Sequence, residues 1–313
     1  MDRARHLHGP ALRYFAAVAR SGSIRSAARE LNVASSAVNR QILWLEQMLG
    51  HELFDRLARG VRLTPAGEVL RAHVQRTLSD FEATVGDLDA LTGMQRGSVH
   101  VTTVESLAET LVPSVISAFR QRFPGIHLHV RLTGAEGVAR ALFAGETDVG
   151  FSFEPPNDPR ISTAFHRDLA IGAIMRPDHP LAGRAGLILA DCLRHRFCLP
   201  SRGLSLRKRI DAALGERDLA GEAFVETNSL RLMKSLALDD GTIAFQTVLG
   251  LEGELAAGTL VFRPLADVDL RRNRFGILTS SHRGLGHAAK AFFDHAVSAI
   301  GERLSQSDAD PAS

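Results

Sequence analysis

Four side chains in the stretch LNVASSAVNRQILWLEQMLG could form specific hydrogen bonds with another molecule. Asn can form two hydrogen bonds with adenine, Arg can form two with guanine, and Ser can bond either base. These side chains are Ser35, Ser36, Asn39 and Arg40. The apolar residues Ile42, Leu45 and Leu49 have the spacing of one side of an amphipathic helix. This apolar side is expected to face a core, and the four polar side chains are expected to lie on another side. The alternative is that the serines cap this helix while the other two side chains are solvated.

Two shorter helices are predicted before this one. LRYFAAVARSG forms the first, ending at Gly22, and IRSAAREL forms the second, capped by Ser23. The second ends at Asn32, the non-glycine residue type that best tolerates a left-handed backbone. Ala27 and Ala28 allow close approach of the helices. The predicted shared core consists of Leu31, Val33, Val38 and Ile42. The pattern predicts a helix-turn-helix whose last helix enters the major groove, and this context favours DNA contact.

A short hairpin is predicted after the third helix, in HELFDRLARGVRLTPAGE. Phe54 and Leu57 are expected to be buried, and the chain is expected to turn at Gly60. Arg59 and Arg62 flank the tip, which is the composition of a wing that grips phosphates. Such contacts set the register on DNA without reading its sequence. Residues 1–63 are therefore predicted to form a winged helix-turn-helix domain that binds DNA.

The next segment, 64–92, predicts a long helix suited to pairing. Thr64 can cap it and Pro65 suits its first position. Its apolar residues recur at spacings of four, three, four and three, which is the pattern of a coiled coil. They are Val74, Leu78, Phe81, Val85 and Leu88. A helix of about 28 residues is about 40 Å long. We therefore expect this seam to pair with the same helix of a second chain, the alternative being packing on its own domain.

The composition is that of a globular protein with two or three domains. The 313 residues are 45% hydrophobic and 23% charged. No apolar run approaches the roughly 18 residues that span a bilayer, and no signal-peptide pattern follows the N-terminus. Cys192 and Cys198 are the two cysteines of the chain, which is too few for a disulfide framework and agrees with a reducing compartment. The chain is therefore expected to be cytoplasmic, without membrane contact. Residues 1–62 hold ten Arg and five acidic residues, so their net charge is +5 in a chain of +2, which favours a polyanionic partner.

From Ser98 onward, strands alternate with helices, which predicts parallel sheets with crossover helices. The first of these helices is expected over 106–125. A second series begins after about residue 169, and a final strand and helix return to the first. Two α/β lobes crossed twice by the chain form a cleft, where such folds bind ligands. The predicted domain covers 93–302, with lobe I at about 98–167 and 267–302, lobe II at about 168–266, and a disordered tail at 303–313.

Several predicted strand ends could bind a small polar effector in this cleft. Helix starts follow three of them, so free N–H groups would point into the cleft. The candidate residues are Val104, Glu105, Ser106, Gly134, Ala135, Arg202, Thr227, Asn228, Gln246 and Thr247. Ordinary helix capping is the alternative for each. Glu105 and Glu136 stand beside two of the helix starts, which points toward an effector with an amine or several hydroxyl groups.

The stretch AARELNVASSAVNRQILWLEQMLGHELFDRLARGVRLTPAGE resembles the N-terminal domain of LysR-type transcriptional regulators. The matching positions are Ala27–Ala28, Val33, Arg40–Ile42, Leu45–Glu46, Leu53–Phe54 and Leu63–Gly67. The resemblance continues through FRQRFPGI, AGETDVGF, PDHPLAG and ELAAGTLV. It implies a winged helix-turn-helix, a linker-helix dimer often assembled into tetramers, and a periplasmic-binding-protein-like effector domain.

The chain departs from the family pattern at three places. Ala34–Ser35 stand where the family often has Ser-Gln, and Asn39 stands where a Ser is common. Gln246–Thr247 replace a frequent Leu-Pro. Neither an operator sequence nor an effector can therefore be carried over from other members.

Together these observations predict a sequence-specific DNA-binding regulator that is not an enzyme. Its expected partners are double-stranded operator DNA, a small-molecule effector and further copies of itself in a homodimer or tetramer, with RNA polymerase as a further candidate. The alternative is a solute-binding protein or an enzyme on the same two-lobed fold. For the two cysteines, a buried structural role is favoured over a redox role. His127 and His129 share one face of a predicted strand, but no third metal ligand is evident. No metal or cofactor is predicted.

Overall fold

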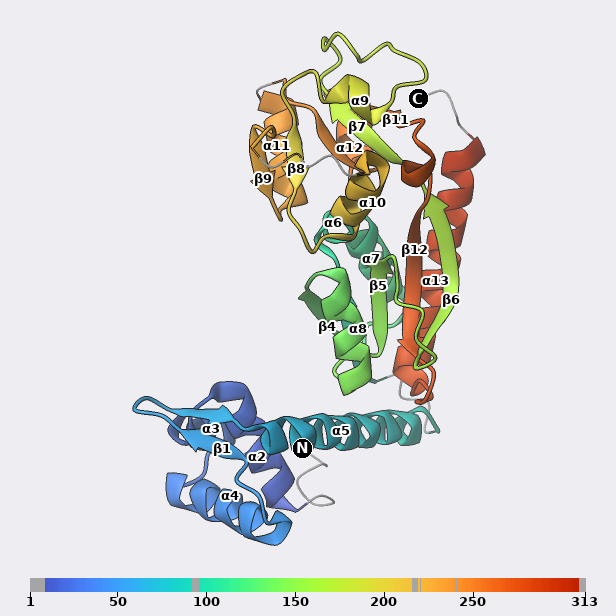
Figure 1. The fold of residues 1–313 in the computed structure, drawn as a ribbon. Coiled ribbons are helices and arrows are strands. Elements are labelled where there is room, and N and C mark those ends of the chain that lie inside the picture. The colour runs from blue at the N-terminus through green and yellow to red at the C-terminus, as the bar shows by residue number, and fades with distance from the viewer. Residues whose placement is uncertain (1–8, 92–95, 216–218, 220, 240, 310–313) are drawn as a thin grey trace. The chain divides into compact units, whose positions relative to one another are not determined.

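The computed structural model describes residues 9–91, 96–215, 219, 221–239 and 241–309. The chain forms two compact units, one built mainly from residues up to Ser98 and one mainly from Val99 onward. Figure 1 labels their elements. Among the described residues, no helix combines the length and the apolar character needed to cross a membrane.

The N-terminal unit contains the predicted helices and hairpin in the predicted order (Figure 1). Its elements are α2 (Pro10–Ser21), α3 (Ile24–Leu31), α4 (Ser35–Leu49), β1 (Phe54–Arg56), β2 (Val61–Leu63) and α5 (Pro65–Leu91). Gly22 ends α2 in the left-handed conformation, and Asn32 ends α3 with φ 55°. Ser23 caps α3 by accepting a hydrogen bond from the Ser26 N–H. The local sequence signals therefore specify the helix-turn-helix, as predicted.

The core of this unit lies between the three short helices and the start of α5. Phe15, Val18, Ala28, Val38 and Ile42 are among its buried residues, as their spacing indicates. The prediction was wrong for Leu57, which is 50% exposed because it follows the three-residue strand β1 and belongs to the turn at Gly60. Leu49, in the last turn of α4, is also exposed.

The predicted seam of α5 is divided between two environments. Val74 is only 1% exposed and lies in the core of its own unit, and Leu78 packs against the same core. Val74 is therefore unavailable to a second chain, which corrects the prediction at this residue. Phe81 and Val85 are half-buried and Leu88 is 56% exposed. The heptad spacing marks one continuous apolar stripe, but its first residues pack into the core of the N-terminal unit of the same chain.

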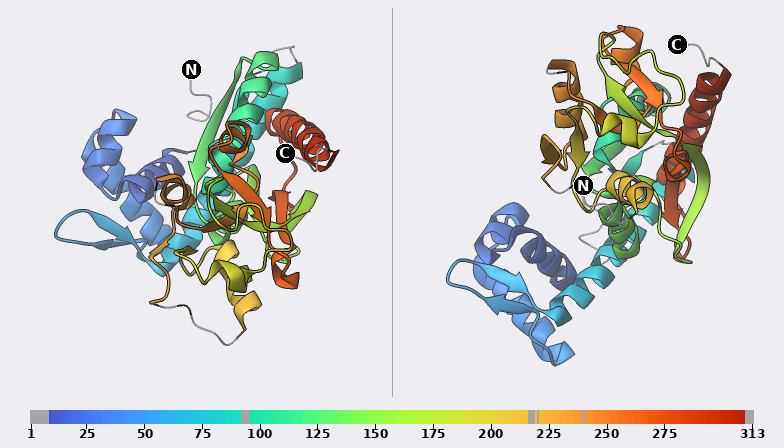
Figure 2. Two further views of the ribbon diagram at one scale, coloured as in Figure 1. Left: turned by 90° about the horizontal axis from the view of Figure 1, so that it is seen from above. Right: turned by 45° about the horizontal axis from the view of Figure 1, so that its top comes forward.

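Lobe I of the larger unit is a five-stranded sheet with helices on both faces. Its elements are β3 (Gly97–Thr103), α6 (Glu105–Ala108), α7 (Leu111–Arg122), β4 (Ile126–Leu132), α8 (Ala135–Ala144), β5 (Val149–Phe153), β6 (Ile161–Leu169), β12 (Asn273–Ser280) and α13 (His287–Ala309). The strand order is β4-β3-β5-β12-β6. On one face the Phe292 ring of α13 meets Phe151 of β5 and Phe119 of α7, and α13 lies along the sheet in Figures 1 and 2. On the other face, Gly150 leaves room for Val138 of α8.

Lobe II is built around the short sheet β10-β7-β11. Its elements are β7 (Ile171–Met175), α9 (Leu189–Cys192), β8 (Cys198–Pro200), α10 (Ser205–Leu214), β9 (Val225–Thr227), α11 (Leu230–Asp239), β10 (Ala244–Thr247), α12 (Glu252–Ala256), β11 (Val261–Pro264) and η1 (Val268–Leu270). Ala173 packs with Ile210 of α10 in one core cluster, while Ile174 packs with Met233 of α11 in another. Successive residues of β7 thus bury against opposite layers.

The sheets are mixed rather than purely parallel, which corrects the prediction. β3 pairs with β5 in parallel, but β12 runs antiparallel to both β5 and β6. In lobe II, β7 is antiparallel to both of its neighbours. The chain crosses between the lobes twice, as predicted, through β6–β7 and again after η1. Leu270 belongs to the lobe II core, so the return lies a few residues later than predicted.

Two further predictions about helices are corrected. The helix expected over 106–125 is split into α6 and α7, because Pro113 has no N–H and is tolerated only in the first turn of a helix. Helix α13 runs to Ala309, and Leu304 is buried, so residues 303–309 are helical rather than disordered. The rest of the predicted tail, 310–313, lies outside the described residues.

Candidate functional site

The recognition face, which we define as Ser35, Ser36, Asn39 and Arg40, lies on the N-terminal half of α4. Val38, Ile42 and Leu45 hold the opposite side of α4 in the core. Ser35, Ser36 and Arg40 are exposed, and Asn39 is half-buried. Ala34 rather than a serine stands at the N-cap, and no side chain caps the helix there. The serine hydroxyls are therefore not used as the helix cap.

Arg56 of β1 joins this face, although the sequence did not single it out. Its guanidinium donates to the Asn39 Oδ1 at 3.5 Å, and its side chain is exposed. The contact links the hairpin to the recognition helix across 17 residues of sequence. The only sequence signal was its place in the basic segment, because nothing local showed that β1 would lie beside α4.

A backbone hydrogen bond also attaches the hairpin formed by β1 and β2 to the helix-turn-helix. The Val61 N–H donates to the Gly22 carbonyl at 2.8 Å, and a Cβ on Gly60 would lie 2.4 Å from the same oxygen. Gly60 has φ 87°, so both its conformation and its space require glycine. Arg59 and Arg62 are exposed as predicted, but Arg62 also pairs with Asp55 at 3.2 Å. Part of the Arg62 charge is thus balanced within the hairpin.

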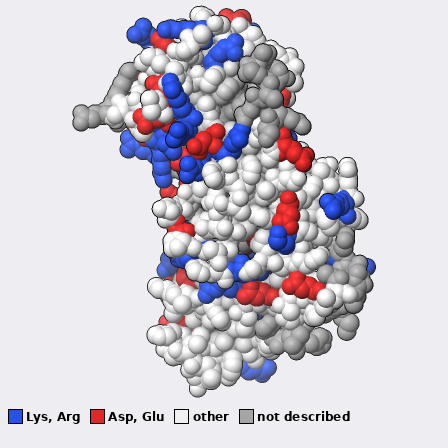
Figure 3. Space-filling view, turned by 90° about the vertical axis from the view of Figure 1, so that its right-hand side faces the viewer, with Lys and Arg blue, Asp and Glu red and all other residues white. Residues whose placement is uncertain are grey.

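Many other surface charges of the chain are also paired. On the face drawn in Figure 3, Lys and Arg side chains lie beside Asp and Glu side chains in several places. In the larger unit, for example, Arg274 pairs with Asp168 at 3.1 Å. Mixed charges of this kind do not attract a polyanion strongly. The basic excess of residues 1–62 is therefore the feature that matters for nucleic acid.

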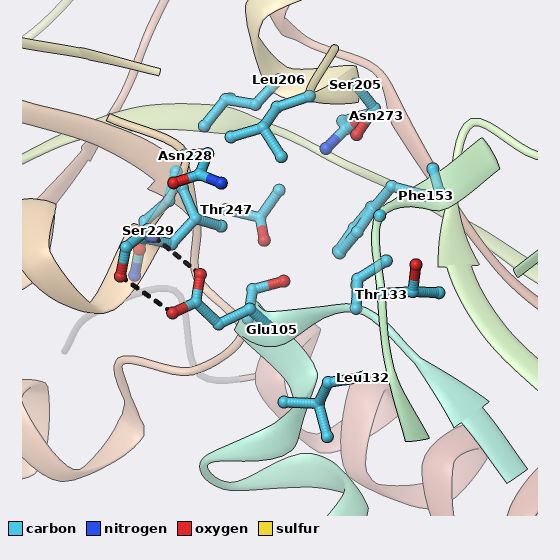
Figure 4. A pocket seen from close by; sticks show the side chains of 17 residues that line it. Glu105, Leu132, Thr133, Phe153, Ser205, Leu206, Asn228, Ser229, Thr247 and Asn273 are labelled. Atoms are coloured by element: carbon cyan, nitrogen blue, oxygen red, sulfur yellow. Dashed lines mark hydrogen bonds between the residues drawn. The ribbon is translucent and has the colours of Figure 1, made fainter. Parts of the chain in front are cut away.

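A cavity of about 450 Å³ lies between lobes I and II of the larger unit (Figure 4). Lobe I contributes the ends of β3, β4 and β5 and the starts of α6 and α8. Lobe II contributes the starts of α10 and α11 and the end of β10. The lining residues are Val104, Glu105, Ser106, Leu132, Thr133, Gly134, Ala135, Phe153, Leu204, Ser205, Leu206, Asn228, Ser229, Leu230, Gln246, Thr247 and Asn273. The volume is within the range of small-molecule sites.

Eight of the ten predicted effector residues line this cavity. They are Val104, Glu105, Ser106, Gly134, Ala135, Asn228, Gln246 and Thr247. Thr227 is not among the lining residues, and its hydroxyl accepts a hydrogen bond from the Ser229 N–H. Arg202 is exposed in the turn after β8, and the lining is supplied instead by Leu204–Leu206. These two residues are corrections to the prediction.

Asn273 is the most informative lining residue that the sequence did not indicate. It begins β12, an antiparallel strand, so the N-terminal end of this strand reaches the cavity. The rule that ligands bind at the C-terminal ends of parallel strands could not find it. Phe153, Leu132 and Leu206 were missed because apolar lining residues have the same pattern as core residues.

Glu105 links the two lobes at the edge of the cavity. Its Oε1 accepts from the Ser229 hydroxyl at 2.9 Å, and its Oε2 accepts from the Leu230 N–H at 3.0 Å (Figure 4). A carboxylate from lobe I thus occupies the positive N-terminus of α11 in lobe II. Arg209 pairs with Glu154 at 2.7 Å and also crosses between the lobes. Such polar links are contacts that a bound molecule could strengthen or break.

The two cysteines are placed as structural residues. Both are buried, and they belong to different core clusters of lobe II. Burial raises the pKa of the Cys192 thiol to about 12, so almost none of it is the reactive thiolate at neutral pH. Within the part of the chain that the structure describes, no group of three or more His, Cys, Asp and Glu side chains could hold a metal ion.

Two family descriptions match the chain, one for each unit. "Bacterial regulatory helix-turn-helix protein, lysR family" matches residues 10–68, and "LysR substrate binding domain" matches residues 92–300. A probable RuBisCO transcriptional regulator of Cyanidioschyzon merolae is 29% identical over 287 residues, which cover 90% of this chain and 94% of that protein. The two matches together cover both the recognition face and the cavity.

Solved structures share the fold. A full-length OxyR variant from Pseudomonas aeruginosa has a TM-score of 0.71 at 19% identity, covering 93% of this chain and 95% of its own. Full-length CbnR in complex with its target DNA has a TM-score of 0.60 at 20% identity, and the match covers 92% of this chain and 98% of the CbnR chain. At such identities the comparison establishes the fold alone.

Proposed function

The chain belongs to the LysR family of transcriptional regulators, and we propose that its recognition face reads operator DNA under the control of a small molecule bound between lobes I and II. It is a LysR-type regulator with a helix-turn-helix and an effector-binding domain. The observation that carries the proposed DNA site is that three polar side chains of α4 are exposed while its apolar side is sealed in a core. A solute-binding or catalytic function gains no support from the comparisons.

The cavity supplies a physical route for control. Glu105 and Arg209 join the lobes through hydrogen bonds and ion pairs at the cavity and close to it. A molecule that binds one arrangement of the lobes more tightly shifts the population toward it. The effect on DNA binding cannot exceed the difference between the free energies with which the molecule binds the two arrangements. We therefore propose Glu105 and its lobe II partners as the contacts that respond to the effector.

We propose that the exposed part of the α5 seam pairs with a second copy of the chain, in a homodimer or a tetramer. Leu88 is 56% exposed although it continues the heptad pattern of Phe81 and Val85. A two-fold dimer would present two recognition faces to two half-sites on DNA. RNA polymerase is a further candidate partner of such an assembly. We propose that the regulator acts in the cytoplasm and catalyses no reaction.

Replacing Leu88 by glutamate is expected to weaken this self-association by about tenfold or more, because each copy would bury an unpaired charge. Analytical ultracentrifugation over a range of concentrations measures the change. His73→Glu is the matched control, since His73 is exposed on α5 and lies off the seam. Equal association of the two variants would contradict the proposed seam.

The proposed function is tested by selecting bound duplexes from a random-sequence pool with the full chain. We expect enrichment of a partly palindromic sequence whose half-sites lie about one or more helical turns apart. A variant that replaces all four side chains of the recognition face by alanine should enrich no sequence. If the unaltered chain enriches nothing beyond random duplexes, the proposed function is wrong.

A further inference from the structure

We propose that Leu43 extends the recognition face by contacting the C5-methyl group of a thymine in each half-site of the operator. This inference rests on the proposed function, because it adds a specificity-determining residue to the same DNA site. The methyl group forms no hydrogen bond, so an apolar side chain is needed to detect it.

The first observation is the side of α4 on which Leu43 lies. An α-helix turns by about 100° per residue, so Ser36, Arg40, Leu43 and Gln47 form one row along the helix. All four are exposed, and Leu43 is 46% exposed. Two of them, Ser36 and Arg40, belong to the recognition face. Leu43 is thus the apolar member of a row that continues this face toward the end of α4.

The core of the N-terminal unit does not account for this leucine. The side of α4 that packs into the core consists of Val38, Ile42 and Leu45, on the opposite side of the helix. Single exposed apolar residues are common on protein surfaces, so exposure alone assigns no role to Leu43. Its place in the exposed row that includes Arg40 is what points to the partner of the recognition face.

The spacing along α4 suits a second contact with the bases. Leu43 follows Asn39 by four residues, which is about 6 Å along the axis at 1.5 Å per residue. Successive base pairs are about 3.4 Å apart, so a helix that follows the groove would carry Leu43 about two base pairs beyond Asn39. The major groove admits an α-helix, and thymine displays its methyl group there. The leucine is therefore placed to contact a thymine close to the base that Asn39 reads.

The charges around Leu43 favour DNA over a second copy of the chain as its partner. Arg40 precedes it in the row, and the exposed Arg56 is bonded to Asn39. Residues 1–62 carry a net charge of +5. In a two-fold contact through this face, the arginines of one copy would meet those of the other, and like charges repel. DNA instead offers phosphates to the arginines and a methyl group to the leucine.

Replacing thymines one at a time by deoxyuridine tests the contact. The change removes the methyl group and keeps every hydrogen-bonding group of the base pair. The probe is the duplex enriched in the selection described above, with the same replacement made in both half-sites. At one thymine position, the full chain should bind the deoxyuridine duplex about fourfold less tightly, which corresponds to the burial of one methyl group. Fluorescence anisotropy measures the two affinities.

Two leucine variants connect this difference to the named residue. Leu43→Ala should bind the thymine and deoxyuridine duplexes equally, because the shorter side chain does not reach the methyl group. Leu49→Ala is the matched control: Leu49 is 47% exposed on the same helix but is turned about 120° away from Leu43. It should keep the fourfold difference. Circular dichroism verifies that both variants are folded.

The inference is overturned if no thymine of the selected duplex is sensitive to the replacement, or if Leu43→Ala keeps the difference seen with the unaltered chain. It is also overturned if Leu43→Ala weakens self-association in the ultracentrifuge and leaves the thymine difference intact, since a second copy would then cover the leucine. A chain that selects an operator but does not distinguish thymine from deoxyuridine retains the proposed function and loses only this inference. A chain that selects no duplex loses both.

Discussion

Replacing Gly67 by alanine is expected to unfold the N-terminal unit at temperatures where the unaltered chain is folded. A Cβ at this position would lie 2.1 Å from the Leu53 carbonyl oxygen and 3.1 Å from its carbon. These are backbone atoms, and the same carbonyl already accepts the Thr64 N–H at 3.0 Å. The first turn of α5 is thus held directly against the end of the segment that joins α4 to the hairpin.

The clash outweighs what alanine would gain as a helix former. Alanine is favoured over glycine in a helix by about 1 kcal/mol. Forcing extra atoms into packed structure commonly costs about 1–3 kcal/mol, and more where backbone must move. We expect a net loss of about 2 kcal/mol or more from a unit whose total stability is on the order of 5–15 kcal/mol.

Trp44 allows the unit to be followed separately, since it is the single Trp of the chain and lies on α4. The midpoint of thermal unfolding measured by Trp fluorescence should fall by more than about 10 °C in Gly67→Ala. Gly9→Ala is the control, because a Cβ there meets nothing within 4 Å. A midpoint in Gly67→Ala equal to that of the control would show that the close approach is not as tight as described.

The N-terminal unit was predictable because its signals are local. Gly22, Ser23 and Asn32 each fix one helix end through their own conformational or hydrogen-bonding preferences. Their spacing then leaves few ways to pack three short helices. Even here, contacts between residues far apart in the sequence could not be predicted from it, as the hydrogen bond between Arg56 and Asn39 shows.

The cavity was predictable only in part, since it depends on how strands are ordered and directed. The helix starts at Glu105 and Ala135 could be placed from alternating patterns, and both line the cavity. Asn273 could not, because its role follows from β12 returning antiparallel between β5 and β6. Val74 illustrates the same limit for α5, since a heptad stripe does not specify which molecule covers it.

The second large effect is expected at Arg40, which is exposed on the recognition face beside Asn39, the residue that accepts the hydrogen bond from Arg56. Arg40→Ala should lose about 1–3 kcal/mol of discrimination at one base pair of each half-site, because a bidentate contact with guanine distinguishes that pair from the others. Competition binding with operator variants, each altered at one position, measures this loss.

Arg62→Ala is the matched comparison, because it removes the same side chain from the hairpin rather than from α4. Arg62 pairs with Asp55 and lies where a phosphate contact would set register. Its loss should weaken binding to every duplex by a similar factor and make the affinity fall less steeply with salt concentration. The two variants thus separate base reading from phosphate contact by different measurements. An Arg40→Ala protein with unaltered base preference, or an Arg62→Ala protein impaired on one sequence alone, would contradict the roles assigned to these residues.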